Sequence, residues 1–168
     1  VGAGNYFTDS TSGYFFGGSG SFTNGVYGVG TNNMAFNVNG GEKLRIDSSG
    51  NIIIASTGGT LQTATAGTSN FRAGVNAGNS ITSGGNYNTV VGDNAGTAIT
   101  TGDENIAIGF NSLLTEDTGK FSVAIGVGAL QTQNNDGNNY NTAVGHEAGK
   151  LVTTGINNTF MGGLCGDG

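Results

Sequence analysis

Five carboxylates are the residues of this chain whose type and spacing best suit chemistry. They are Asp103, Glu104, Glu116, Asp117 and Asp136, and all lie in segments rich in Gly, Asn and Thr. A carboxylate pair can hydrolyse a polysaccharide, and stacked acidic turns can bind calcium. The simpler interpretation is a set of solvated turn residues that keep the edges of the fold soluble. The G-G-x-G-x-D repeat of calcium-binding β-rolls is missing, which weakens the calcium hypothesis.

Other reactive side chains are few. His146 is the sole histidine and follows a recurring glycine, in a slot whose residue type varies along the chain. Cys165, the sole cysteine, falls among small residues, which indicates a packing thiol and excludes an internal disulfide. The glycine-rich stretches 15–20 and 25–30 do not lead from a strand into a helix, so we interpret them as turns. We therefore predict no enzymatic activity, no metal and no cofactor.

Three aromatic residues are the best candidates for binding. Tyr87, Phe121 and Tyr140 each stand directly before the Asn or Ser that opens a repeated motif. If the repeats stack, these rings align near one edge. They either pack against neighbouring repeats or form a ridge on which sugar rings stack.

The repeated motif is the main feature of the sequence. Asn-x-x-x-Gly, with Ser for Asn once, recurs every 17 to 19 residues. The repeat glycines are Gly74, Gly92, Gly109, Gly126, Gly145 and Gly162. Three residues after each stands a small residue: Ala77, Ala95, Ser112, Ala129, Ala148 and Cys165. Such a period predicts an all-β chain whose residues 70–168 form a parallel β-solenoid of about six coils.

Each motif is predicted to form a short strand. Residues two apart share a face, so Ile106 and Ile108 point to one side and Ala107 to the other. The glycine that ends the strand indicates a positive φ or a close backbone approach. The column of small residues indicates a second close contact.

Residues 1–60 do not follow this period and form a separate region of strands and turns. Residues 34–54 predict a three-stranded meander, with a hairpin turn at Asn39-Gly40 and a second turn from Ser48 to Asn51. Residues 61–69 show no strong pattern and are predicted to be the junction between the two regions.

The charge and the apolar content of the chain limit which partners and assemblies are possible. The net charge of −6 disfavours nucleic acid, and no apolar stretch is long enough for a membrane-spanning helix. One coil holds only two to four sizeable apolar side chains. At about 1.5–3 kcal/mol each, they barely offset the ordering of the backbone at about 1–2 kcal/mol per residue. A core shared between copies of the chain would relieve this deficit, so we expect an oligomer.

Two parts of the chain, residues 34–54 and 70–168, resemble known families. E-K-L-R-I-D-S-S-G-N-I-I-I at 42–54 resembles a segment of bacteriophage tail fibres and related virion appendages. N-T-V-V-G-D-N-A-G and S-V-A-I-G-V-G-A-L are similar to the head repeats of trimeric autotransporter adhesins, which form a parallel β-roll. The coils here are longer than those of the adhesin heads.

The resemblance implies a homotrimer in the virion, attached to other tail or fibre proteins and contacting a glycan or protein of the host surface. A bacterial surface adhesin or extracellular filament is the alternative, and a polysaccharide-degrading tailspike a minor one. An ice-binding solenoid is disfavoured because the threonines form no regular T-x-T ladder.

Overall fold

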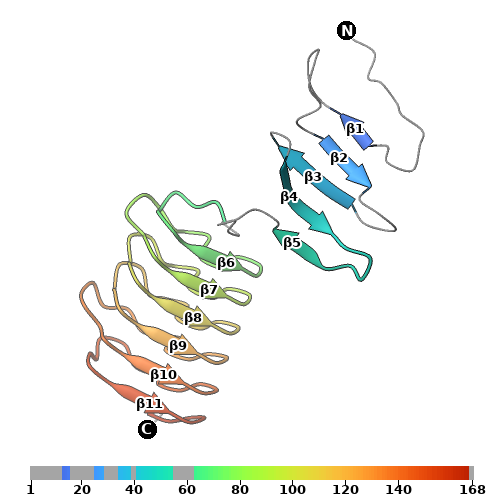
Figure 1. Cartoon of the computed structure of the whole chain (residues 1–168). Helices are drawn as coiled ribbons and strands as arrows, with labels where there is room; N and C mark the ends of the chain where they lie inside the picture. The colour runs from blue at the N-terminus through green and yellow to red at the C-terminus, as the bar shows by residue number, and fades with distance from the viewer. Residues whose placement is uncertain (1–12, 16–24, 29–33, 39–40, 55–62, 167–168) are drawn as a thin grey trace. The chain divides into compact units, whose positions relative to one another are not determined.

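The computed structural model describes residues 13–15, 25–28, 34–38, 41–54 and 63–166. These residues form strands and turns and no helix, as the sequence predicts. Contacts divide the chain into two units, Val1–Leu61 and Gln62–Gly168. Each unit contains one sheet (Figure 1).

The first unit is an antiparallel sheet whose five strands pair in chain order. The strands are β1 (Gly13–Phe15), β2 (Gly25–Gly28), β3 (Met34–Val38), β4 (Gly41–Ile46) and β5 (Ile52–Ile54). Strands β3, β4 and β5 confirm the predicted meander. The Asn39-Gly40 turn lies outside the described residues. The interpretation of residues 25–28 as a turn is wrong, because Val26 and Tyr27 pair on both sides with neighbouring strands.

Asp47 organises the turn between β4 and β5. Its Oδ1 accepts the backbone N–H groups of Ser49 at 2.9 Å and Asn51 at 2.8 Å. Its Oδ2 accepts the Asn51 side-chain amide at 2.9 Å. Gly50 supplies the positive φ of 83° that this turn requires. The hydrogen bonds from Asn51 and Ser49 hold the pKa of Asp47 below its usual value.

One face of this sheet is apolar across β3, β4 and β5. Its side chains form two cross-strand rows: Met34, Ile46 and Ile52 in one, and Phe36, Leu44 and Ile54 in the other. Met34, Phe36 and Ile52 are 46%, 40% and 71% exposed. A sheet normally buries such a face against a second layer.

The second unit is the predicted parallel β-solenoid, with one strand in each coil. Its strands are β6 (Phe71–Ala73), β7 (Thr89–Val91), β8 (Ile106–Ile108), β9 (Val123–Ile125), β10 (Thr142–Val144) and β11 (Thr159–Met161). They stack in sequence order in one six-stranded sheet (Figure 1). Equivalent residues lie in register, so that Ala107 pairs with Ala124 and Ala124 with Ala143.

The central residue of each of the strands β7 to β10 faces the inside of the coil. Val90, Ala107, Ala124 and Ala143 are fully buried, whereas the residues on either side of each are half-buried on the outer face. The sequence predicted the two opposite faces, and the structure shows which one is internal. In β8 and β9 the larger strand side chains, Ile106, Ile108, Val123 and Ile125, therefore point out of the coil.

Backbone packing explains the two recurring columns. The six repeat glycines have φ between +118° and +141°. In the first five, an added Cβ would lie less than 3.0 Å from the carbonyl group of the next repeat glycine. Of the small residues, Ala77, Ala95, Ser112, Ala129 and Ala148 are fully buried. Cys165 is only half-buried, because β11 has a neighbouring strand on one side only.

The fourth residue after each repeat glycine forms a third column, here called the fourth-position column. Its members are Gly78, Gly96, Leu113, Leu130, Gly149 and Gly166, all with φ between +47° and +78°. Where glycine stands there, a neighbouring side chain fills the space. A Cβ on Gly96 would lie 2.7 Å from Cδ1 of Ile99 and 2.8 Å from Cγ1 of Val90.

In two coils, the residue at the fourth position itself fills the interior of the coil. Leu113 and Leu130 are fully buried, although positive φ is rare for leucine. The seventh residue after the repeat glycine, which is Ile99 in the coil before, is Glu116 or Gln133 in these coils. Leucine at the fourth position thus accompanies a polar side chain at the seventh.

Part of the predicted junction caps the first coil. The Thr63 hydroxyl accepts the Arg72 N–H at 2.9 Å and donates to the Asn70 carbonyl at 3.0 Å. The Thr65 hydroxyl accepts the Asn70 side-chain amide at 2.9 Å. These hydroxyls satisfy backbone and side-chain groups at the free edge of β6.

Candidate functional site

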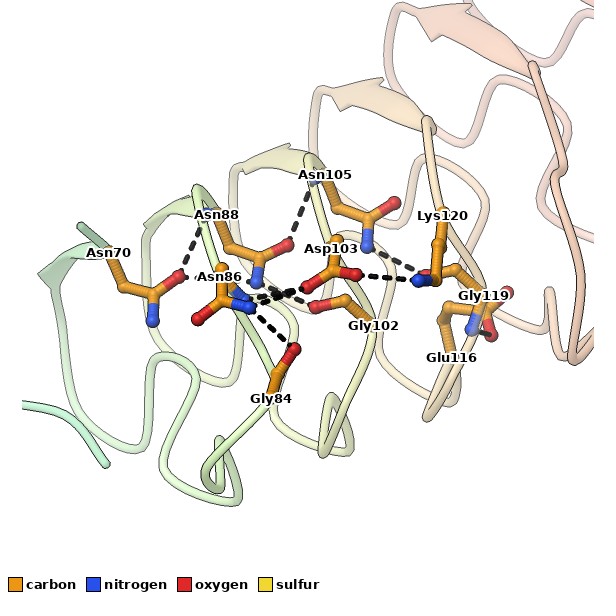
Figure 2. A network of polar contacts seen from close by, with 10 residues as sticks. All are labelled: Asn70, Gly84, Asn86, Asn88, Gly102, Asp103, Asn105, Glu116, Gly119 and Lys120. Atoms are coloured by element: carbon orange, nitrogen blue, oxygen red, sulfur yellow. Dashed lines mark hydrogen bonds and ion pairs between the residues drawn. The ribbon is translucent and has the colours of Figure 1, made fainter. Parts of the chain in front are cut away.

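A ladder of buried asparagines runs through the coils where each strand begins. Asn88 is fully buried; its backbone N–H donates to Oδ1 of Asn70 at 2.8 Å, and its own Oδ1 accepts the Asn105 N–H at 2.9 Å. The Asn88 side-chain amide donates to the Gly102 carbonyl at 2.8 Å, and that of Asn105 to the Gly119 carbonyl at 2.8 Å. Figure 2 shows this ladder. The same geometry recurs in successive coils. It explains why Asn opens the repeated motif, because one side chain satisfies two buried backbone groups.

A second, partly exposed polar row lies two residues before these asparagines. Oδ1 of Asp103 accepts the Asn86 N–H at 2.9 Å, and Oδ2 of Asp103 forms an ion pair with Nζ of Lys120 at 2.6 Å (Figure 2). Partial burial by itself raises the pKa of Asp103. The hydrogen bonds from Lys120 and Asn86, with the positive charge of Lys120, outweigh burial and hold this pKa below its usual value.

Glu116 is fully buried, so the prediction that it is a solvated turn residue is wrong. Its Oε1 accepts the Gly119 N–H at 2.7 Å. Its Oε2 accepts the side-chain amides of Asn139 at 2.9 Å and Gln133 at 3.0 Å, and the Asn135 N–H at 3.3 Å. These donors belong to the turn of its own coil and to the loop of the next coil.

Gln133 extends this network where the asparagine ladder is interrupted by Ser122. Its amide also donates to the Ser122 hydroxyl at 2.7 Å, and its Oε1 accepts the Asn141 side-chain amide at 2.7 Å. Both Gln133 and Ser122 are fully buried. The longest coil, which runs from Gly126 to Gly145, is therefore joined to its neighbour through side chains.

The structure does not bring the candidate reactive groups together. Asp103 is bound to Asn86 and Lys120, whereas Glu116 faces the coil interior (Figure 2). Glu104, Asp136 and His146 are exposed, and Asp117 is half-buried. Among the described residues, no three His, Cys, Asp or Glu side chains converge as a metal site would require. Asp103, Glu116 and Asp117 each accept a backbone N–H of the coils instead.

Two of the three candidate binding aromatics pack on each other. The rings of Phe121 and Tyr140 lie in consecutive coils with centroids 5.1 Å apart and an interplanar angle of 8°. Tyr87 is 60% exposed, and Glu104 occupies the equivalent position between it and Phe121. Each of these four residues has φ between 51° and 62°. This arrangement favours packing between coils over a continuous sugar-stacking ridge.

Sequence reasoning missed the buried role of Glu116 and the exchange at the fourth position. The signal was available in the repeat alignment. Glu116 occupies the column of Ile81, Ile99 and Val152, where a charged side chain replaces an apolar one. Leu113 in the same coil replaces a glycine. Two departures within one coil indicate that they compensate each other.

Within the part of the chain that is described, no helix is long and apolar enough to cross a membrane. The chain matches no protein-family model, no curated protein and no solved structure.

Proposed function

We propose that this chain is a structural, non-enzymatic segment of a viral tail fibre, assembled as a homotrimer and presenting contacts to a host-cell glycan or protein. The observation that carries the proposal is the outer face of the solenoid sheet. Its strands direct β-branched aliphatic side chains outward and keep alanine inside. The interior of the coils already holds Ile99, Leu113 and Leu130, so the outward aliphatic side chains form a second apolar face that a solitary solenoid would leave in water.

This outer face is continuous over several coils. Ile106 and Ile108 of β8 lie beside Val123 and Ile125 of β9 in register. Two residues after the ends of these strands, Phe110 is 51% exposed and Val127 is 43% exposed. Contiguous apolar surface of this kind marks an interface between proteins. Identical chains are its natural partners, because repeating coils present the same surface at the same spacing.

The first unit independently supports self-association. Its sheet has an apolar face of two cross-strand rows, with Ile52 71% exposed. Burying that face against other copies would supply the second layer that a sheet normally needs. The resemblance of residues 42–54 to phage fibre segments and of the coils to adhesin heads supports the virion role and the trimer.

Light scattering after size exclusion tests the assembly. A trimer has a mass of about 50 kDa, three times the 16.7 kDa of one chain. We expect Ile108→Glu with Ile125→Glu to give a folded monomer, because each protomer would place two carboxylates in the apolar contact. Ser83→Glu with Thr101→Glu adds the same charge at exposed turn positions and should leave the trimer intact.

A folded wild-type monomer would overturn the shared-core proposal. Receptor contact is tested separately, by binding of the labelled trimer to host cells with and without surface glycans. Binding that disappears with the glycans would identify a glycan receptor. Binding to neither preparation would contradict the presentation of host contacts by this segment.

A further inference from the structure

We propose that Tyr87, Glu104 and Phe121 form a binding site for a quaternary ammonium group, the cationic group of choline. The site gives a chemical class to the host contact, and in that respect it rests on the proposed function. The three residues stand directly before the Asn or Ser of consecutive coils, in a position here called the ring column. Its members are Ser69, Tyr87, Glu104, Phe121, Tyr140 and Asn157.

The backbone holds the three side chains of the site in one line. The Glu104 N–H donates to the Asn86 carbonyl at 2.9 Å, and the Phe121 N–H donates to the Asp103 carbonyl at 3.2 Å. Tyr87, Glu104 and Phe121 have φ of 58°, 57° and 62°. Because the backbone conformation repeats from coil to coil, the side chains leave it in the same direction. Tyr87 and Glu104 are exposed and Phe121 is half-buried, so a ligand in solution can reach them.

The spacing of the rings suits a cation placed between them. Neighbouring coils lie about 4.8 Å apart, and the Phe121 and Tyr140 rings keep this spacing, with centroids 5.1 Å apart. Tyr87 and Phe121 are two coils apart, which separates their rings by about 10 Å. A cation midway lies about 5 Å from each ring, within the range of about 6 Å over which an aromatic face attracts a cation. A sugar ring stacked on one of them, at about 4 Å, would leave the other ring unused.

Glu104 supplies a negative charge between the two rings. Within residues 63–166, which the structure describes, the basic side chains have other partners: Lys120 pairs with Asp103, Lys150 pairs with Glu147, and Arg72 donates to the Ala77 carbonyl. No basic side chain of these residues therefore neutralises the Glu104 carboxylate. The net charge of −6 on the whole chain also attracts cations.

The same groups favour a quaternary over a primary ammonium ligand. A primary ammonium group has three N–H donors, which need acceptors when they leave water. The site offers the carboxylate of Glu104, whereas that of Asp103 is bound to Lys120 and Asn86. A quaternary ammonium group has no N–H donor, and its methyl groups can contact both ring faces.

NMR titration of the full chain with choline chloride, at constant ionic strength, tests the site. We expect saturable shifts of the amide signals of Tyr87, Glu104 and Phe121. The neutral analogue of choline, in which a tert-butyl group replaces the trimethylammonium group, should bind at least about tenfold more weakly, because it keeps the shape and loses the charge. The primary amine n-butylammonium should also bind more weakly than choline.

Substitutions in the ring column assign the binding to these residues. Glu104→Gln should weaken choline binding about two- to fivefold through the loss of charge. Tyr87→Ser places the residue type of Ser69 in the next coil and should weaken binding by a similar factor, whereas Tyr87→Phe keeps the ring and should retain binding. Asp93→Asn is the matched control, because it removes an exposed carboxylate after strand β7, at the other end of that strand from Tyr87. It should bind choline as the wild type does.

The absence of saturable shifts with choline would overturn the proposal, and so would equal binding of the neutral analogue or tighter binding of n-butylammonium. Unchanged choline binding in both Glu104→Gln and Tyr87→Ser would also overturn it, because the cation would then bind elsewhere. The amide spectra show whether each variant is folded. Light scattering of the same samples separates this test from that of the proposed assembly, since a trimer that does not bind choline contradicts the site alone.

Discussion

At the residue scale, the size of one side chain determines what its neighbours can be. A Cβ on Gly96 would meet Ile99 and Val90 at less than 3.0 Å. Leu113 occupies the equivalent position in the next coil, where the strand residue beside it is Ala107 and the seventh residue is polar. Interior volume is therefore conserved from coil to coil although its source changes.

Gly96→Leu should consequently destabilise the solenoid by about 1–3 kcal/mol through overpacking. Adding Val90→Ala and Ile99→Ala should restore much of the loss, because these substitutions vacate the space that the leucine takes. Urea unfolding of the single and combined variants measures the coupling. Strictly additive effects would show that the three side chains do not share one space.

Asp103 makes stability depend on pH. Its pKa is lowered in the folded chain, because the hydrogen bonds from Lys120 and Asn86 outweigh the effect of burial. Its contribution is therefore present above the unfolded carboxyl pKa of about 3.9 and is lost as the pH falls through the lower folded pKa. Asp103→Asn should cost less than about 1 kcal/mol near neutral pH, because the ion pair is partly exposed and Asn also accepts the Asn86 N–H. Thermal unfolding from about pH 7 to 2 compares the two proteins; a greater cost in acid would contradict the sign.

At the element scale, the buried asparagine ladder holds each strand to the turn and strand of the next coil. Asn105 accepts the Ser122 N–H at 2.9 Å and donates to the Gly119 carbonyl at 2.8 Å. Asn105→Ala would leave both backbone groups buried without these partners, at a cost of about 2–4 kcal/mol. Ser122→Ala removes one hydroxyl acceptor and should cost less. Chemical denaturation that ranks these variants in the opposite order would contradict the ladder's role.

These elements differ in how far the sequence predicts them. The period, the repeat glycines and the strand alternation predict the coils, because a positive φ and close stacking restrict which residues can stand there. Alternation alone does not show which strand face is internal. Whether Ala107 or Ile106 faces the interior depends on the width of the coil, which the alternation does not reveal. The burial of Glu116 escaped prediction because it depends on a loop from the following coil, about 20 residues away in sequence.

At the scale of the whole molecule, each unit leaves an apolar sheet face outside. The first unit exposes Ile52, and the solenoid exposes Phe110 and Val127 beside its outer strand residues. Two separate faces of the same character are costly for one chain in water and favourable for an assembly of identical chains. The proposed assembly would bury these two faces and so offset the small apolar area that a single coil buries.

A solenoid whose coils contact only their neighbours should tolerate the loss of one complete coil. Removal of residues 88–104 joins Tyr87 to Asn105, which is 17 residues from Asn88 and occupies its position in the ladder. Asn105 would then stack on Asn70, and every later strand would keep its inward face. We expect a folded protein with the wild-type number of protomers and modestly reduced stability. Removal of residues 88–96 takes out only part of a coil and leaves Gly74 and Gly109 26 residues apart, outside the 17 to 19 residues of the native coils, so this variant should be much less stable. Circular dichroism and light scattering compare the two deletions, and equal behaviour would contradict the independence of the coils.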